Sequence, residues 1–349
     1  MELWQVELRQ ACSDVQVLAQ RFALDAADLE PVAERYPVRL TPHLMKLAES
    51  APQLVRQQFV PDPAELADGL QPSDPLNEEA LSPVPQLVHR YPHRVLLLVC
   101  SSCFSYCRFC TRKRRVGCRD QAVSLGEVMR AIDHIAEHPE MNEVILSGGD
   151  PLTLPDSLLK EILERLRRIP HVDVLRLGSR APMAMPSRIT PQLCALLGRC
   201  QPLYLLTHFN HPAELTPEAV AACEQLVAAG ILLINQTVLL RGVNDDPQVL
   251  YDLFYRLYRL RVRPYYLHQM DLTRGTAHFR TRLETGIAIM AGLRGRLSGL
   301  AMPHYIVDLP GGLGKIPLTP DYTECLGDEA RLRAADGTLV HYPQQPDAR

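Results

Sequence analysis

Short apolar runs alternate with amphipathic stretches from about residue 94 to about residue 294. The runs are rich in leucine and β-branched residues and have the length of buried strands, whereas the stretches between them repeat apolar residues at helical spacing. The pattern predicts strands over residues 94–100, 143–147, 172–178, 202–208, 231–239 and 262–269. It predicts helices over residues 124–138, 155–169, 190–198, 216–229, 247–259 and 282–294.

This series of strand–helix units predicts the fold class. Strands that alternate with helices form a parallel sheet with the helices outside it, which is an α/β fold. A complete barrel of this kind needs eight units. The six units found here therefore predict a partial (β/α)6 barrel that stays open on one side.

The flanking segments have different patterns. Residues 1–85 form an N-terminal helical segment that ends in a proline-rich connector, and a helix is expected near residues 42–50 because Thr41-Pro42 is a start signal. Residues 86–322 hold the barrel, and residues 323–349 are polar and are expected to form a C-terminal tail.

Composition narrows the class of protein. The net charge of −3 gives no basic field for nucleic acid, and no apolar stretch approaches the ~20 residues that a membrane helix needs. The N-terminus lacks the pattern of a secretory signal, so a cytoplasmic enzyme is expected. In a reducing compartment the ten cysteines are expected to be free thiols or metal ligands rather than disulfides.

Three of these cysteines form a compact motif. Cys103, Cys107 and Cys110 follow the first predicted strand directly, separated by three and two residues. One loop can present three thiolates at this spacing to a [4Fe–4S] cluster and leave the fourth iron open to a small molecule. A zinc site stays open as an alternative, because Cys100 and Cys118 lie nearby.

A glycine-containing turn follows the second predicted strand. It comprises Ser147, Gly148, Gly149, Asp150 and Pro151. Adjacent glycines let the backbone approach a ligand closely, although a tight strand-to-helix turn would need them too. The turn lies at the same end of the sheet as the cysteine loop, where ligands collect in parallel α/β folds, and this favours a ligand-binding role.

Four segments together resemble the lysine 2,3-aminomutase family. They are the cysteine motif followed by Arg112, the Gly-Gly-Asp-Pro turn, residues 207–212 (THFNHP) and residues 235–245 (NQTVLLRGVND). The resemblance extends from about Leu81 to Tyr322. It implies a radical S-adenosylmethionine (SAM) enzyme with a [4Fe–4S] cluster that also uses pyridoxal phosphate (PLP).

The resemblance also implies roles for individual residues. Lys315, at the end of a glycine-rich loop, would hold the aldehyde of PLP, although Leu313 stands where the family commonly has another glycine. Arg90 and Arg94 would bind the PLP phosphate, and Ser147, Gly148, Gly149, Asp150, His208 and Gln236 would line the cofactor region. Arg112 would bind the α-carboxylate of the substrate, and Asp271 and Asp308 its ε-ammonium group.

The activity implied by the resemblance is an isomerase that converts L-lysine to β-lysine. The cluster would cleave SAM to a radical that takes hydrogen from Cβ, and nitrogen would then migrate from Cα to Cβ. The partners expected are an amino-acid substrate and a cellular electron donor, and a homo-oligomer is left open. The chain lacks the C-terminal zinc-binding extension of longer family members and in its length resembles the branch that serves elongation factor P. Two alternatives are arginine or another cationic amino acid as substrate, and a non-catalytic iron–sulfur redox protein.

Overall fold

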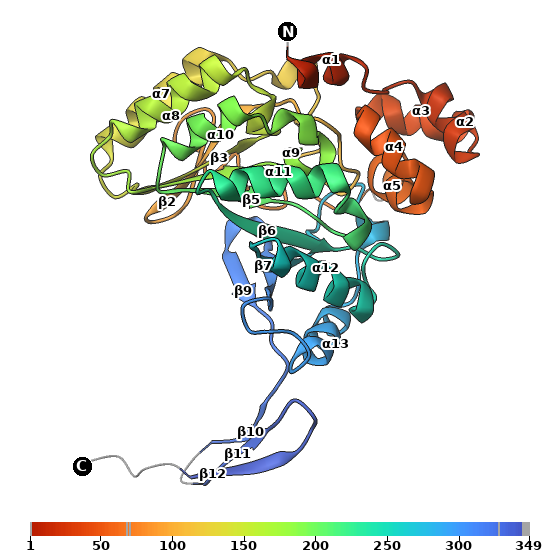
Figure 1. Cartoon of the computed structure of the whole chain (residues 1–349), viewed down its shortest axis with the longest axis vertical. Helices are drawn as coiled ribbons and strands as arrows, with labels where there is room; N and C mark the ends of the chain where they lie inside the picture. The colour runs from red at the N-terminus through yellow and green to blue at the C-terminus, as the bar shows by residue number, and fades with distance from the viewer. Residues whose placement is uncertain (1, 68, 70, 327–328, 344–349) are drawn as a thin grey trace.

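A nine-stranded sheet, curved into a partly closed barrel, forms the centre of the molecule (Figure 1). The computed structural model describes residues 2–67, 69, 71–326 and 329–343. The strands follow one another in chain order, with β2 to β8 parallel and the outermost strands β1 and β9 antiparallel to their neighbours. Their bounds are β1 (Leu87–Tyr91), β2 (Arg94–Cys100), β3 (Glu143–Gly148), β4 (Val174–Gly178), β5 (Leu203–Thr207), β6 (Leu232–Leu239), β7 (Val262–Gln269), β8 (His304–Leu309) and β9 (Gly314–Pro317).

The helices between the parallel strands cover the outside of this sheet (Figure 1). They are α7 (Leu125–Glu137), α8 (Asp156–Arg167), α9 (Ala181–Ala184), α10 (Pro191–Gly198), α11 (Pro217–Ala228), α12 (Pro247–Arg259) and α13 (Leu283–Leu293). The six predicted strands and six predicted helices are all present, and the partial barrel is confirmed. The strands β8 and β9 extend the sheet beyond the six predicted units.

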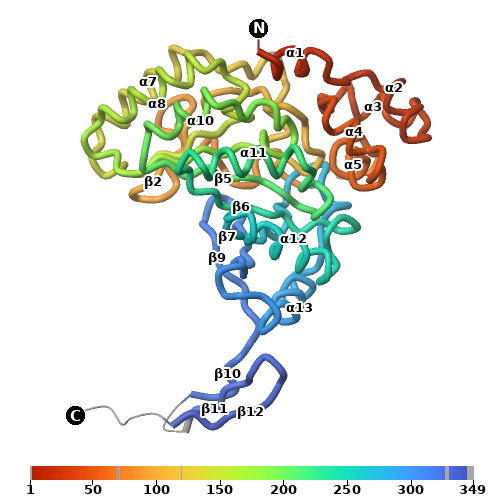
Figure 2. Tube along the Cα trace, viewed as in Figure 1, coloured from red at the N-terminus to blue at the C-terminus, as the bar shows by residue number. Residues whose placement is uncertain are grey.

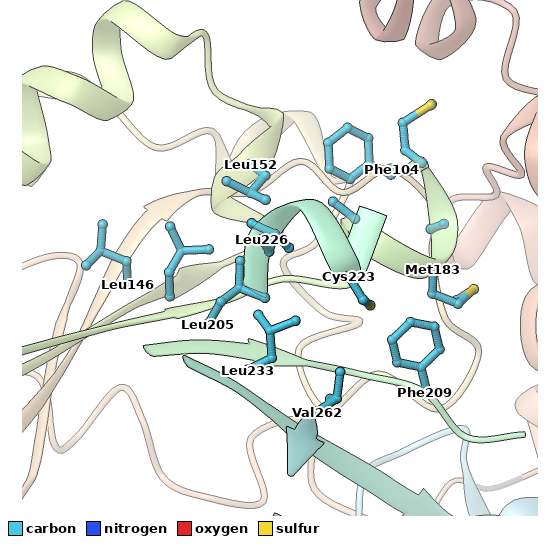
Figure 3. Close-up of a cluster of buried hydrophobic side chains, with 14 of the residues drawn as sticks. Phe104, Leu146, Leu152, Met183, Leu205, Phe209, Cys223, Leu226, Leu233 and Val262 are labelled. Atoms are coloured by element: carbon cyan, nitrogen blue, oxygen red, sulfur yellow. The ribbon is translucent and has the colours of Figure 1, made fainter. Parts of the chain in front are cut away.

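The core lies between the sheet and these helices (Figure 3). Leu205 of β5 and Leu233 of β6 pack in one cluster with Cys223 and Leu226 of α11, and all four side chains are almost completely buried. Burying a leucine stabilises a fold by roughly 1.5–3 kcal/mol. The core therefore holds the strand ends, and the loops that follow them, in fixed positions.

The N-terminal segment lies beside the barrel (Figure 2). Its helices are α1 (Leu3–Arg9), α2 (Val15–Phe22), α3 (Ala26–Arg35), α4 (Pro42–Ser50), α5 (Pro52–Phe59) and α6 (Ala64–Ala67). The predicted helix near residues 42–50 is α4, and the Thr41 hydroxyl accepts a hydrogen bond from the Leu44 N–H at 3.2 Å. The ring of Trp4 meets that of Phe104 edge-on at 6.2 Å, so α1 contacts the cysteine loop directly.

The segment after residue 322 contains strands that the sequence did not indicate. The strands β10 (Thr323–Cys325), β11 (Glu329–Arg333) and β12 (Leu339–Pro343) form a separate antiparallel sheet. This sheet projects away from the barrel (Figures 1 and 2). Across the described ranges, none of the helices combines the length and the apolar character needed to cross a membrane.

The barrel remains open between β1 and β9, which exchange no ladder of backbone hydrogen bonds. Side chains bridge this seam instead. The Lys315 N–H donates to the Tyr91 hydroxyl at 3.2 Å, and the Arg90 guanidinium donates to Asp308. The seam therefore brings residues from both ends of the barrel sequence to one place.

Candidate active site

The loop after β2 carries the three cysteines and is fastened by the N-terminal segment. The Arg39 guanidinium donates to the Cys103 carbonyl at 2.8 Å and to the Ser102 hydroxyl at 3.1 Å. Arg39 also stacks over the Tyr106 ring, with its guanidinium carbon 5.0 Å from the ring centre. The conformation of the loop therefore depends on a residue about sixty positions upstream.

A buried ion-pair cluster fixes the second half of the loop. The Glu65 carboxylate, which is fully buried, accepts two hydrogen bonds from Arg108 at 2.8 and 2.7 Å and one from Lys113 at 2.6 Å. Burial would raise the pKa of Glu65, but the two cations outweigh it and lower this pKa. Burial lowers the pKa of Lys113 to about 8. Glu65 is the shared counter-charge of two buried cations, so its removal would leave both of them uncompensated.

The three predicted ligands lie close enough together to interact electrostatically. The pKa of Cys103 is raised well above its usual value by burial and then by Asp150 and the neighbouring thiols, including Cys107 and Cys110. The pKa of Cys110 is raised to about 11, again by burial first and then by Cys107. Such an arrangement disfavours free thiolates and gains stability from a positively charged group bound between the sulfurs.

This donor set suits a cluster of several irons. Within the described residues, no three His, Cys, Asp or Glu side chains lie close enough together to enclose a single metal ion. A four-iron cluster spaces its cysteine ligands more widely than one ion does, because each sulfur binds a different iron. The three thiols on one loop interact electrostatically and provide one sulfur for each of three irons.

The glycine turn after β3 packs directly against the cysteine loop. A Cβ atom on Gly148 would lie 2.2 Å from the Cys100 carbonyl oxygen, and one on Gly149 would lie 2.1 Å from the Ser102 carbonyl oxygen. The Gly149 N–H donates to the Cys100 carbonyl at 2.7 Å. These glycines are therefore required for close backbone packing, whatever else they bind.

The carboxylate of Asp150 is occupied by the protein. It accepts hydrogen bonds from the Leu152 N–H at 3.0 Å, the Ser179 hydroxyl at 3.0 Å and the Arg180 N–H at 2.8 Å. Burial raises the pKa of Asp150 to about 6, although these hydrogen bonds oppose the rise. Asp150 thus joins the end of β4 to the glycine turn, and its predicted contact with a cofactor stays a prediction.

A cavity of about 180 Å³ opens beside the cysteines and is called the cluster cavity here. Cys103, Cys107, Gly149, His208 and Gln236 are among its lining residues. His208 is held by Asn210 at 3.0 Å, and burial lowers its pKa well below the usual value. The Arg180 guanidinium reaches the same space and donates to the Cys107 sulfur at 2.9 Å.

A second cavity of about 300 Å³, the lysine cavity, lies inside the barrel next to the first. Gly178, Leu206 and Gln236 line both cavities, so ligands in the two spaces would be immediate neighbours. The lysine cavity brings together most of the other predicted site residues, namely Arg90, Arg94, Arg112, Ser147, Asp271, Asp308 and Lys315.

Two cations hold Asp308 at the seam of the barrel. Arg90 and the Lys315 ammonium group each form an ion pair with its carboxylate. Burial would raise the pKa of Asp308, but the hydrogen bonds and charges of these partners outweigh it and lower the pKa. Asp308 therefore stays ionised in the neutral pH range.

Asp271 lies near this pair but has no cation of its own. Its side chain makes no ion pair or hydrogen bond with any other described residue. Burial raises the pKa of Asp271 to about 7, and the charge of Asp308 raises it further in the same direction. A buried carboxylate of this kind is stabilised when a cation binds next to it.

The guanidinium of Arg112 is fixed between two elements. It forms an ion pair with Glu78 at 2.6 Å and donates to the Ser147 hydroxyl at 3.2 Å. Arg94 lines the same cavity, with its guanidinium carbon 4.3 Å from the centre of the Tyr91 ring and its Nη1 3.9 Å from Glu143.

The loop that carries Lys315 needs glycine at some positions only. Gly312 has a φ of +81°, and a Cβ atom there would lie 2.8 Å from the Leu76 carbonyl oxygen. Leu313 has a φ of −71° and is 80% exposed, so a side chain is tolerated at this position. The substitution of leucine for the family's glycine therefore leaves the loop able to adopt its turn.

Sequence reasoning missed several residues that line the lysine cavity. They are Glu78, Tyr91, Arg176, Tyr265, Tyr266 and His268. The positions of Tyr266 and His268, two residues apart on a strand of the barrel, would have indicated that both point to one face. Glu78 gave no such signal, because it lies in the connector before the barrel.

Comparisons with known proteins define the class first. The radical SAM superfamily model matches residues 97–254, which include the cysteine loop and the strands and helices from β3 to the greater part of α12. Together with the partial barrel, this match makes the chain a radical SAM enzyme and implies a four-iron cluster and SAM.

Closer relatives identify the family. A model described as lysine-2,3-aminomutase matches residues 290–348. L-lysine 2,3-aminomutase from Fusobacterium nucleatum is 45% identical over 98% of this chain and 81% of its own length. The enzyme of that name from Clostridium subterminale is 42% identical over 98% of this chain and 84% of its own. Glutamate 2,3-aminomutase from Clostridioides difficile is 39% identical over 98% of this chain and 82% of its own. The chain belongs to the lysine 2,3-aminomutase family, and its activity is that of an aminomutase, an isomerase.

Proposed function

We propose that this aminomutase depends on PLP and converts L-lysine to β-lysine. In this proposal Cys103, Cys107 and Cys110 hold the cluster, Lys315 holds PLP, and the lysine cavity receives the substrate beside the cofactor. The shared walls of the two cavities support the proposal, because the radical chemistry of SAM must occur within contact distance of the substrate.

The observation that carries the choice of lysine is the ion pair between Lys315 and Asp308. A primary alkyl ammonium group already lies on Asp308, with Asp271 close by and unpaired. When Lys315 is used to hold PLP, Asp308 loses this partner. The ε-ammonium group of a substrate lysine then restores the missing positive charge and also serves Asp271.

The carboxylate pair argues against an acidic substrate. The family includes an enzyme named for glutamate, so family membership leaves the side chain of the substrate open. A glutamate side chain would place a third carboxylate beside Asp271 and Asp308 in a buried site, and like charges repel strongly there. A guanidinium group would suit both aspartates, so arginine belongs in the assay as the rival substrate.

The residues of the lysine cavity fit PLP. Lys315 provides the primary amine, while Arg90, Arg94 and Arg176 provide guanidinium groups for a phosphate. The Nε atom of Arg90 is buried and has no hydrogen-bond partner, so this arginine keeps a donor for a further acceptor. Bound PLP would supply an aldehyde for the substrate amine and a conjugated ring that can delocalise an unpaired electron. The protein would orient the substrate through Arg112 and the aspartates and would exclude water.

An anaerobic assay tests the proposal. The reconstituted protein is incubated with SAM, PLP, a reductant and lysine, arginine or glutamate in separate reactions. We expect β-lysine from lysine and little or no product from glutamate. A higher kcat/KM for arginine than for lysine would show that arginine is the preferred substrate. Formation of product from none of the three amino acids would contradict the proposal.

Absorbance tests the role of Lys315 separately. Lys315→Ala should lose the visible absorbance of covalently held PLP, because among the described residues that line the cavity Lys315 is the only lysine. Lys160→Ala is the matched control, since Lys160 is an exposed helical lysine that pairs with Glu164 at 3.7 Å. Equal PLP absorbance in both variants would exclude Lys315 as the attachment site.

A further inference from the structure

The connector before the barrel contributes a charged residue to the lysine cavity. Leu76 and Glu78 both line this cavity, although they lie upstream of the first strand. Glu78 is 5% exposed, which is unusual for a glutamate unless its charge is paired. Its partner is Arg112, the residue expected to bind the substrate carboxylate.

The geometry of this pair leaves part of Arg112 available. Its Nε lies 3.0 Å from both oxygens of Glu78, and its Nη2 lies 2.6 Å from Oε1. Glu78 therefore occupies the edge of the guanidinium formed by Nε and Nη2. The second edge, formed by Nη1 and Nη2, faces no carboxylate among the described residues. On this edge Nη1 donates a hydrogen bond to the Ser147 hydroxyl at 3.2 Å. A guanidinium can bind one carboxylate on each of these two edges, because its five N–H groups are fixed in one plane.

Arg114 reduces the effect of Glu78 on the charge of Arg112. It lies 3.8 Å from Oε2 of Glu78 and 3.1 Å from Asp74. Burial would raise the pKa of Glu78, but Arg112 and Arg114 outweigh it and lower this pKa. Glu78 stays ionised and is shared between two cations, so Arg112 keeps positive charge for an incoming anion.

The same connector contacts the loop that carries Lys315. The Gly311 N–H donates to the Pro75 carbonyl at 2.8 Å, and Gly312 is close-packed against the Leu76 carbonyl. One short segment therefore fixes both Arg112 and the lysine loop. The α-amine and the α-carboxylate of an amino acid are both bonded to Cα. The relative position of Arg112 and the Lys315 loop therefore sets the orientation of the substrate Cα.

From these contacts we infer that Glu78 is a positioning residue for the substrate carboxylate. It fixes Arg112 so that the Nη1–Nη2 edge is presented to the carboxylate of an amino acid whose α-amine would replace the Lys315 amine on PLP. The inference rests on the proposed function and adds a residue of the connector to its substrate site.

The test compares two ligands on each variant. Lysine carries the carboxylate, whereas cadaverine is lysine without it and keeps both amines. Dissociation constants are measured from the change in PLP absorbance when each ligand binds, and KM and kcat are measured for lysine. In Glu78→Gln the amide NH₂ group would meet the N–H groups of Arg112 and turn the guanidinium. We expect the dissociation constant and KM of lysine to rise about ten-fold or more, while cadaverine changes less than about two-fold.

The control is Glu79→Gln, which alters the neighbouring carboxylate. Glu79 is exposed and contacts Arg114 at 3.2 Å rather than Arg112, so neither ligand should bind differently. Unchanged lysine binding in Glu78→Gln would overturn the inference. Equal losses for lysine and cadaverine, or loss of iron and PLP together, would mean that Glu78 only stabilises the fold, and would overturn it as well. Failure of the wild-type protein to bind lysine would instead contradict the proposed function.

Discussion

The unpaired carboxylate of Asp271 predicts a pH dependence of lysine binding that a single substitution should remove. Burial raises the pKa of Asp271 to about 7, while the pKa of Asp308 is lowered. A cationic side chain binds the ionised form of Asp271. At a pH below the pKa of Asp271, the carboxyl group must therefore lose its proton before lysine binds. The affinity for lysine should therefore fall as the pH falls through 7, whereas Asp308 stays charged over the same range.

The magnitude follows from the pKa. One pKa unit corresponds to about 1.36 kcal/mol, so each pH unit below 7 should raise the KM of lysine about ten-fold. The charge of Lys315 lowers the pKa of Asp271 in the free protein. Use of Lys315 to hold PLP removes that charge, so the decline should begin at pH 7 or slightly above it.

Asp271→Asn should remove this contribution to the pH dependence. The amide cannot ionise, so the KM of the variant should rise less steeply below pH 7 than that of the wild type. At pH 8 the variant should bind lysine about ten- to one-hundred-fold more weakly, because a hydrogen bond to a charged group contributes about 1.5–3 kcal/mol. Initial rates measured anaerobically between about pH 5.5 and pH 8.5, with saturating SAM and PLP, give both results.

Comparison between variants separates Asp271 from other titrating groups. The amines of lysine and PLP titrate in every variant, so only the difference between wild type and Asp271→Asn is informative. Asp252→Asn is the matched control, since Asp252 is an exposed helical residue that accepts a hydrogen bond from Gln248 at 2.9 Å. Parallel KM–pH curves for wild type and Asp271→Asn would refute the reasoning.

Three further predictions concern the cysteine loop. Glu65→Gln leaves two buried cations short of a counter-charge, and we expect a loss of about 3–5 kcal/mol in stability with reduced iron content, measured by thermal unfolding and iron analysis. Gly149→Ala places a methyl group against a loop carbonyl and should prevent cluster incorporation, whereas Gly292→Ala, on an open helix surface, should not; equal iron in both would contradict the packing argument. Cys103→Ala, and the same change at the other two proposed ligands, should remove the iron–sulfur absorbance, and Cys12→Ala should retain it.

The fold was predictable because the sequence pattern of each strand and helix lies within that element. Each strand and helix of the barrel carries its own periodicity, and a capping residue such as Ser124, whose hydroxyl accepts from the Glu127 N–H at 3.2 Å, marks a helix start without reference to the rest of the chain. The strands after residue 322 are only three to five residues long, and the apolar residues of β12 are exposed, so no apolar alternation indicated a buried face. A sheet with little buried surface leaves little trace in a hydrophobic pattern.

The site was predictable as a set of residues but not as a set of pairs. Asp271 follows β7 and Asp308 lies near the end of the neighbouring parallel strand β8, which was not predicted, so their pairing was expected only from the family resemblance. The partners of Arg90 and Arg112 were not, because Asp308 lies 218 residues from the first and Glu78 lies 34 residues from the second. Contacts of this kind depend on where a connector folds back, and sequence spacing carries no such information.

The open seam of the barrel places Lys315 at the weakest line of the sheet. Elsewhere around the barrel, neighbouring strands share ladders of backbone hydrogen bonds, but β1 meets the far edge of the sheet through side chains: Tyr91 contacts β9, and Arg90 contacts Asp308 of β8. Separating these edges breaks side-chain contacts and leaves every ladder intact, so local opening there requires no ladder hydrogen bond to break. Under the proposed function, PLP would reach the interior by a transient parting of the wall at this seam, with the core behind β3 to β7 undisturbed. Its attachment to Lys315 would then slow amide hydrogen exchange in β1 and β9 before that in any other strand.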